Sequence, residues 1–152
     1  MMINSANVLD ALVSHAMTLA QFKSVETVEA RNGPGQGISL AIFFEELTPV
    51  GSESGLKSAS VRMQFNARLY SPLVRGNPDQ IDPDLVAATD ALMAAYCADF
   101  TLGGLVRQVD IYGSTGQSLQ ARSGYLPLDE TEYRIVDITV PLIINDAWDL
   151  GE

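Results

Sequence analysis

Few side chains in this sequence have the types and spacing that catalysis requires. The only histidine is His15 and the only cysteine is Cys97, so no histidine and cysteine cluster could hold zinc. Nucleophilic catalysis needs a serine, cysteine or threonine beside an activating base. We interpret His15 as a partly buried packing residue on the first helix, and Cys97 as a small hydrophobic residue on the second. The pattern therefore provides no pair of nucleophile and base.

The acidic clusters do not have the arrangement of a catalytic or metal-binding site. Glu45 and Glu46 are adjacent on a predicted strand and should point to opposite faces. Asp79, Asp82 and Asp84 resemble calcium ligands, but they lack the spacing, the central glycine and the terminal glutamate of an EF-hand loop. Asp82 instead has the position of a helix N-cap. We expect no enzymatic activity, no metal and no cofactor.

The remaining sequence signals indicate turns and a repulsion of nucleic acid. The segments GPGQG and GSTGQS lack the lysine of a P-loop and the GxGxxG fingerprint, so we read both as turns. The formal net charge of −10 repels phosphate backbones, which makes direct nucleic-acid binding unexpected. The acidic excess is concentrated after residue 128, where a solvated surface that aids solubility is the simplest interpretation.

Length and composition fit one soluble domain. A chain of 152 residues with 47% hydrophobic residues can bury roughly two-thirds of its unfolded surface. We expect a single α+β domain over residues 1–144, followed by an acidic C-terminal tail over residues 145–152. No secretory signal and no apolar run of membrane-spanning length is present, and a lone cysteine suits a reducing cytoplasm.

Hydrophobic periodicity predicts two helices and several strands. The first helix should run from residue 4 or 5 to residue 22, with Met17 in its apolar arc. The second should start with Asp82 as N-cap and Pro83 at the first helical position, and end near residue 100. Strands are expected at 37–47, 59–70, 105–112, 119–126 and 133–144, with a weaker one at 24–30.

Two strands carry more detailed expectations. The 59–70 strand alternates apolar and polar residues, which predicts one buried and one wet face. Pro141 lacks an N–H group, so we expect the last strand to lie at a sheet edge or to leave the sheet there. Together the elements predict an α+β fold in which two helices pack on a mostly antiparallel sheet as a two-layer sandwich.

The second helix has one face of bulky residues that we assign to the core: Leu85, Val86, Leu92, Met93, Tyr96 and Cys97. It carries an unusual number of alanines on the opposite face. An ordinary surface helix would show lysine and glutamate there, and a smooth alanine face suits close approach by a second subunit. Two alternatives stay open: alanine is the best helix former, and the sheet of the same chain could cover this face. The face comprises Ala87, Ala88, Ala91, Ala94, Ala95 and Ala98.

Trp148 is the second indication of an interface. A lone tryptophan in an acidic terminal segment is costly to leave in water, so it either anchors a partner or folds back onto its own domain. Phe43 gives its strand a partly apolar second face, and Arg68 and Tyr70 lie on the polar face of the long strand. The candidate interface residues are Ala87, Ala91, Ala94, Ala98, Phe43, Arg68, Tyr70 and Trp148.

The order of elements resembles the tail terminator proteins of long-tailed bacteriophages. The run GYLPLDETEYRIVDITVPLIINDAWD is similar to the final strands of that family, and SVRMQFNARLYSPL is a weaker match. The resemblance implies a homohexameric ring in the neck of the virion tail, assembled in the host cytoplasm. Such a ring caps the completed tail tube and joins it to the head-tail connector, and DNA passes through it without specific binding. We expect acidic residues to line the channel.

Two further functions stay open. A head-tail adaptor or a tail-completion protein is the nearest alternative within the same structural class. A cytoplasmic α+β ligand-binding or regulatory domain is the alternative from a different class, since folds of this kind host many unrelated sites. A light-scattering measurement distinguishes them, because rings favour the terminator whereas a stable, ligand-stabilised monomer favours the binding domain.

Overall fold

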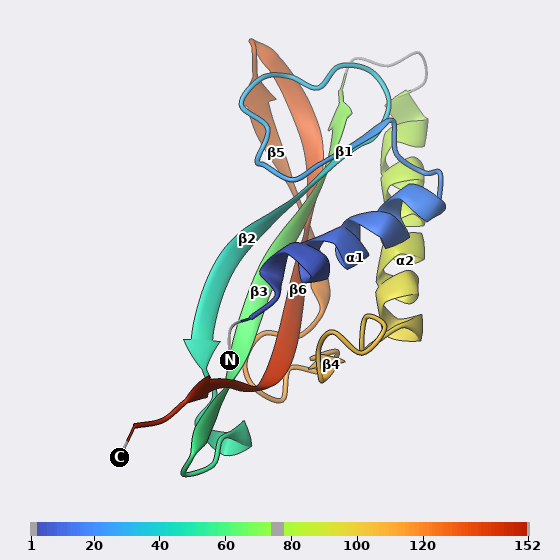
Figure 1. Cartoon of the computed structure of the whole chain (residues 1–152). Helices are drawn as coiled ribbons and strands as arrows, with labels where there is room; N and C mark the ends of the chain where they lie inside the picture. Colours follow the sequence, from blue (N-terminus) through green and yellow to red (C-terminus); the bar gives the residue numbers. More distant parts are fainter. Residues whose placement is uncertain (1–2, 74–77, 152) are drawn as a thin grey trace.

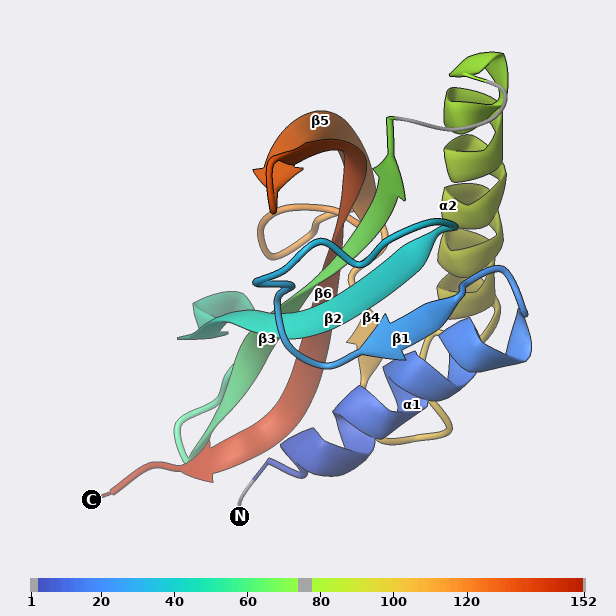
Figure 2. The same cartoon turned by 90° about the horizontal axis from the view of Figure 1, so that it is seen from above.

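Two helices lie on one face of a six-stranded, mostly antiparallel sheet in the computed structural model, which describes residues 3–73 and 78–151 (Figure 1). The fold is therefore α+β, as expected. The first helix, α1, spans Ser5–Thr18 and the second, α2, spans Ile81–Ala98. Viewed from above, both helices lie on the same side of the sheet (Figure 2). Short 3₁₀ turns occur at Gly51–Glu53 and Pro78–Gln80.

The sheet is built around two long central strands. Its order is β1-β2-β3-β6-β4, and β5 also pairs with β6. Among the strand pairs of the described residues, β1–β2 is parallel and the other four are antiparallel. The strands are β1 Ser24–Glu26, β2 Ser39–Pro49, β3 Ser58–Pro72, β4 Gln108–Val109, β5 Gln120–Leu128 and β6 Thr131–Asp149.

The main core lies between the helices and one face of the sheet. Val8, Leu12 and Ala16 of α1 are buried there, and so are Leu85, Ala88, Leu92 and Tyr96 of α2. The even-numbered residues of β6 from Val136 to Ile144 form its part of this face, as the alternation predicted. Met17 was predicted to lie in the apolar arc of the first helix, but its side chain is exposed.

The opposite face of the sheet is also largely covered, which corrects the prediction of a wet face for β3. Ser60, Arg62, Gln64 and Tyr70 are all buried. A second cluster of apolar side chains forms there around Tyr70. The 27–37 segment, the 110–118 segment and β5 supply the partners of these side chains. A single polar stripe cannot reveal such covering segments, because they are distant in sequence.

The prediction for the start of α2 was wrong by two residues. Gln80 is the N-cap residue, and Asp82 lies inside the first turn. The Asp82 carboxylate instead accepts a hydrogen bond from Nε of Arg134 at 3.0 Å, and Asp82 and Asp84 both lie at the positive end of the helix dipole. The first helix also ends early, at Thr18, and Ala20 beyond it has a φ of 55°.

Pro141 does not place β6 at an edge, so that prediction was wrong. β6 pairs with β3 along one side and with β5 and β4 along the other. The Pro141 carbonyl accepts the Asp110 amide at 2.8 Å, so its missing N–H points toward the same side. The β5 pairing ends at Thr139 and the β4 pairing starts at Leu142, so the proline lies in the gap between these two ladders.

The expected tail from residue 145 is also corrected. β6 continues to Asp149, and Ala59 and Ser58 of β3 pair with Trp148 and Asp149. A bulge opposite Ser60 makes this extension possible: Asp146 has a φ of 49°, and its amide donates to the Ser60 hydroxyl at 3.1 Å. Ala147 is consequently buried.

The weaker strand prediction at 24–30 and the prediction at 105–112 were both too long. Only Ser24–Glu26 of the 24–30 prediction forms a strand, and only Gln108–Val109 of the 105–112 prediction does. Leu102, Gly103 and Gly104 all have positive φ angles, which turn the chain between α2 and β4. The apolar residues before β4 therefore pack as a loop: Val106 is buried without strand pairing.

Candidate subunit interface

The described residues bring few reactive side chains together. Nε2 of His15 lies 2.8 Å from Oδ2 of Asp99, and the imidazole packs edge-on against Tyr96. This hydrogen bond, together with one from the Gly103 amide, lowers the pKa of Asp99. His15 thus joins α1 to the end of α2, as its interpretation as a packing residue anticipated.

The acidic side chains are dispersed over the part of the chain that the structure describes. Within residues 3–73 and 78–151, no group of three or more His, Cys, Asp or Glu side chains is placed to hold a metal ion. Asp82 is directed to Arg134 and lies at the surface. Neither α1 nor α2 is long and apolar enough to cross a membrane.

The strongest polar network is buried beneath the 110–118 segment. Arg62 donates to Asp110 at 3.0 Å, to Thr115 at 2.9 Å and to Gln64 at 3.1 Å, and also to the Gln117 carbonyl. Burial by itself raises the pKa of Asp110, but hydrogen bonds from Thr115 and Ser114 outweigh it and lower the pKa to about 2. Both terminal nitrogens of Arg62 donate to partners inside the chain, so the network holds the 110–118 segment on the sheet.

Two edges of the sheet have no second strand beside them in the described part of the chain. β1 pairs with β2 only from Ser39 to Ala41, so β2 is open from Ile42 to Pro49. On the other side, β5 pairs with β6 alone. Open edges present unpaired backbone N–H and C=O groups to another chain. The two edges lie on opposite sides of the molecule and have different sequences.

An apolar groove lies beside the open part of β2. We name it the β2 groove; it has a volume of about 360 Å³. Phe44 is 55% exposed and Leu47 is 39% exposed, and Phe44 packs edge-on against Phe65. The groove is lined by Ile3, Ser5, Ala6, Leu9, Phe44, Leu47, Met63 and Phe65.

A second groove lies between α2 and β5, and we name it the β5 groove. It has a volume of about 330 Å³, and Val86 in its wall is 65% exposed. The Thr89 hydroxyl, which also lines it, is buried without a hydrogen-bond partner. The sequence pattern had placed Val86 in the core, so this groove was missed. Its lining is Val86, Thr89, Asp90, Ala121, Ser123 and Val136.

The structure divides the predicted alanine face. Ala87, Ala94 and Ala98 are exposed and Ala91 is half-buried. Ala88, in contrast, is fully buried in the main core. The sheet of the same chain therefore covers part of the alanine set, and the remaining alanines leave a smooth strip that continues toward the exposed Val86.

The remaining candidate interface residues mostly have partners within the chain. Tyr70 is buried and its hydroxyl accepts the Ala30 amide at 3.3 Å, so it is not on an accessible surface. Arg68 donates to Asp137 and Glu29, each at 2.6 Å, and lies over the ring of half-buried Phe43. Trp148 is 36% exposed at the end of β6. Of these four, Trp148 is the most accessible.

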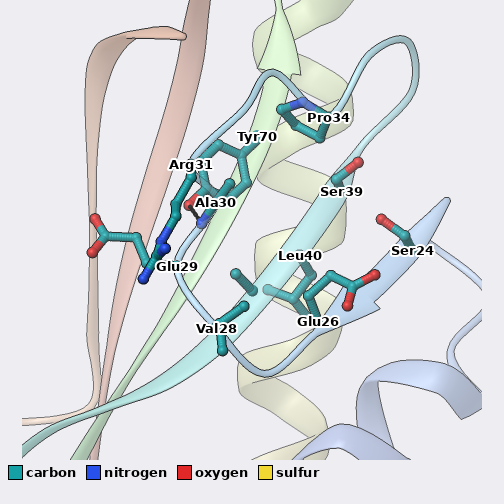
Figure 3. A pocket seen from close by; sticks show the side chains of 11 residues that line it. Ser24, Glu26, Val28, Glu29, Ala30, Arg31, Pro34, Ser39, Leu40 and Tyr70 are labelled. Carbon is teal, nitrogen blue, oxygen red and sulfur yellow. Dashed lines mark hydrogen bonds between the residues drawn. The ribbon is translucent and has the colours of Figure 1, made fainter.

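A cavity of about 450 Å³ lies between β1, β2 and the 27–37 segment (Figure 3). Leu40, Ala41, Ala30 and Tyr70 give it apolar walls. The Ser39 hydroxyl is buried at its side without a hydrogen-bond partner. The lining also includes the exposed side chains of Glu26, Glu29 and Arg31.

Comparison with known proteins gives no match, either to a family model or to a curated protein.

Proposed function

We propose that this protein is a structural virion subunit that resembles a phage tail terminator. In this role it forms a homohexameric ring, caps the completed tail tube and joins it to the head-tail connector. The observation that carries the proposal is the pair of open sheet edges on opposite sides of the chain, each beside a groove with exposed apolar side chains. Two different surfaces that bind each other make head-to-tail contacts, which close into a ring when the rotation permits.

The charge of the subunit is compatible with DNA passage. A formal net charge of −10 disfavours contact with phosphates, and Glu45, Glu46, Glu130 and Glu132 are exposed on or beside the long strands. We propose that acidic side chains line the channel of the ring. A ring structure with an arginine-lined channel would contradict this part of the proposal.

Light scattering combined with electron microscopy tests ring formation. We expect purified protein, alone or after addition of tail tubes, to form six-fold rings, and we expect those rings at the end of the tube. A protein that stays monomeric at all concentrations, with and without tubes, would exclude the terminator function.

The same experiment separates the terminator from related neck proteins. A terminator should bind the end of isolated tail tubes, whereas a head-tail adaptor should bind the connector in the absence of tubes. Co-sedimentation of the protein with each purified assembly therefore distinguishes the two functions.

The cavity beneath the 27–37 segment supports a second candidate function, a ligand-binding domain. The buried, unpartnered Ser39 hydroxyl could be satisfied by a small molecule with an apolar body and one polar group. A thermal-shift screen of such compounds tests this. A stable monomer whose melting temperature rises with one compound, and does not rise when Ala41 is replaced by Trp to fill the cavity, would favour binding over assembly.

A further inference from the structure

We propose that the sheet continues from one copy of the chain to the next, with the open part of β2 paired to β5 of its neighbour. This inference rests on the proposed ring function and specifies its subunit contact. Such an edge pairing supplies backbone hydrogen bonds, and side chains on both faces then determine which edges fit. The occupant of each edge is thus a second copy of this chain.

Strand direction permits the pairing. Because β2–β3, β3–β6 and β6–β5 are all antiparallel, β2 and β5 of one subunit run in opposite directions. A rotation about an axis roughly parallel to the strands keeps the direction of each strand. The β2 strand of the next subunit would therefore run antiparallel to β5, and the alternation of the sheet would continue without a break.

The side chains that line the two grooves lie on the same face of both edges. Phe44 and Leu47 stand opposite Phe65 and Met63 on the helix side of the sheet. On β5, Ala121 and Ser123 stand opposite Ile138 and Val136 on that same side. Rotational symmetry requires such agreement, since the helix layers of all subunits must lie on one side. Phe44 and Leu47 can then enter the β5 groove of the neighbour, beside its Val86.

The opposite face of the same two edges is complementary in charge. Glu46 is exposed opposite Gln64, on the side away from the helices. Arg122 is exposed opposite Asp137, also on that side, and neither Glu46 nor Arg122 has an ion-pair partner within residues 3–73 and 78–151. Glu46 and Arg122 are thus an acid and a base on the same side of the sheet, each without an ion-pair partner among the described residues of its own chain. Their attraction favours this pairing over a random contact.

The bulge in β2 determines which of its side chains share a face, and the pairing of Glu46 with Arg122 then selects one register. Glu45 is the extra residue, since Phe44 pairs with Phe65 and Glu46 with Gln64. With Leu47 opposite Ala121 of the neighbour, Glu46 faces Arg122 and Phe44 faces Ser123. Each of these pairs joins side chains on the same face of the sheet.

The pairing requires a stagger between subunits. Ile42 and Ala121 are at the same level across the sheet, through Ala67 and Ile138, and the open stretches extend from them in opposite directions. The neighbour must therefore be displaced along the strand direction, and a rotation produces such a displacement when the strands are inclined to the ring axis. Tilted strands with such displacements are the rule in closed barrels.

Charge exchange tests the contact. We expect Glu46→Arg and Arg122→Glu each to weaken self-association at least about tenfold by analytical ultracentrifugation, since like charges then face each other. The double variant should recover most of the lost affinity. Asp10→Arg, on the exposed face of α1, is the control for the change in net charge and should not weaken association more than about twofold.

Cross-linking tests the register. In a Cys97→Ser background, Leu47→Cys combined with Ala121→Cys should give, on oxidation, a ladder of covalent oligomers that ends at the ring size. Each single-cysteine variant should stay monomeric on a denaturing gel, because the contact joins two different edges.

The outcomes separate this inference from the proposed function. Wild-type rings whose assembly is unaffected by both charge changes, with no covalent ladder, would overturn the edge pairing and leave the ring function intact. A wild-type protein that never self-associates, even with tail tubes, would overturn both.

Discussion

The neighbouring strands β3 and β2 differ in which side chains they bury. β3 buries a charged side chain, whereas the open part of β2 leaves apolar side chains exposed. On β3, Arg62 is buried together with Asp110, and both terminal nitrogens of Arg62 donate to partners within the chain. On β2, the apolar side chains of Phe44 and Leu47 are exposed beside the open strand edge and the β2 groove. The first region is complete within one subunit, whereas the second gains stability when another surface covers it.

The comparison predicts different consequences for substitution. Changes on β3 should alter the free energy of unfolding of the subunit, and changes on the β2 edge should alter association between subunits. The largest effect is expected in the buried network.

Asp110→Asn should destabilise the subunit by about 3–5 kcal/mol, because it leaves the buried Arg62 guanidinium without a counter-charge. Urea denaturation with fluorescence detection measures the loss. Asp10→Asn, at an exposed position of α1, is the matched control and should change stability by no more than about 0.5 kcal/mol. Equal losses of unfolding free energy in the two variants would show that the network does not stabilise the folded subunit.

Acid should destabilise the wild-type subunit through the same carboxylate. The pKa of Asp110 is lowered from 3.8 to about 2 in the folded state, so the folded state favours the charged form. The resulting contribution, about 2 kcal/mol, is complete above the unfolded pKa and is lost as the pH falls from about 4 toward 2. Stability measured over this pH range should show that loss in the wild type and a smaller one in Asp110→Asn.

Leu47→Lys and Val86→Lys should each weaken association by about 1–2 kcal/mol, close to tenfold, with subunit stability nearly unchanged. Both side chains are already partly in water, so the folded monomer loses little. Leu56→Lys is the control, because Leu56 is 98% exposed in the turn between β2 and β3. If Leu56→Lys weakened association equally, the contact would lie at that turn and not at the two edges.

The smallest expected change is a gain. Asp129 and Glu130 form the two-residue turn between β5 and β6 with φ angles of 51° and 63°, a conformation that glycine adopts without strain. Glu130→Gly should therefore stabilise the subunit by about 0.5–1 kcal/mol in thermal or urea unfolding. Asp129 is kept because its carboxylate accepts the Gly33 amide at 2.6 Å. A loss of stability would indicate that the Glu130 side chain makes a favourable contribution at the turn.

The periodicity of the sequence predicted the helices and the long strands, because one face of each packs against the main core. It did not predict the covered second face of β3, since the residues that cover Arg62 are about fifty positions away. Pro141 suggested a sheet edge because a proline has no N–H group to donate, which the sequence shows directly. The sequence does not show the gap between the β5 and β4 ladders in which this proline lies.

The candidate interface was predicted less well for related reasons. A helical wheel cannot tell which arc the sheet will cover, so Ala88 was assigned outward and Val86 inward. Tyr70 has the alternation of an exposed residue, but the 27–37 segment supplies its hydrogen-bond partner. The open edges have no local sequence signature, because they are defined by the pairings that the sheet lacks.

The position of β6 at the centre of the sheet has a consequence for synthesis on the ribosome. The β1–β2–β3 half and the β4–β5 half are joined only through β6, which follows both in the chain. Until that strand emerges from the exit tunnel, the two halves cannot dock, and such distant pairings form slowly. We therefore expect nascent chains to remain incompetent for assembly until β6 has been translated, which would keep growing polypeptides on one messenger from joining prematurely.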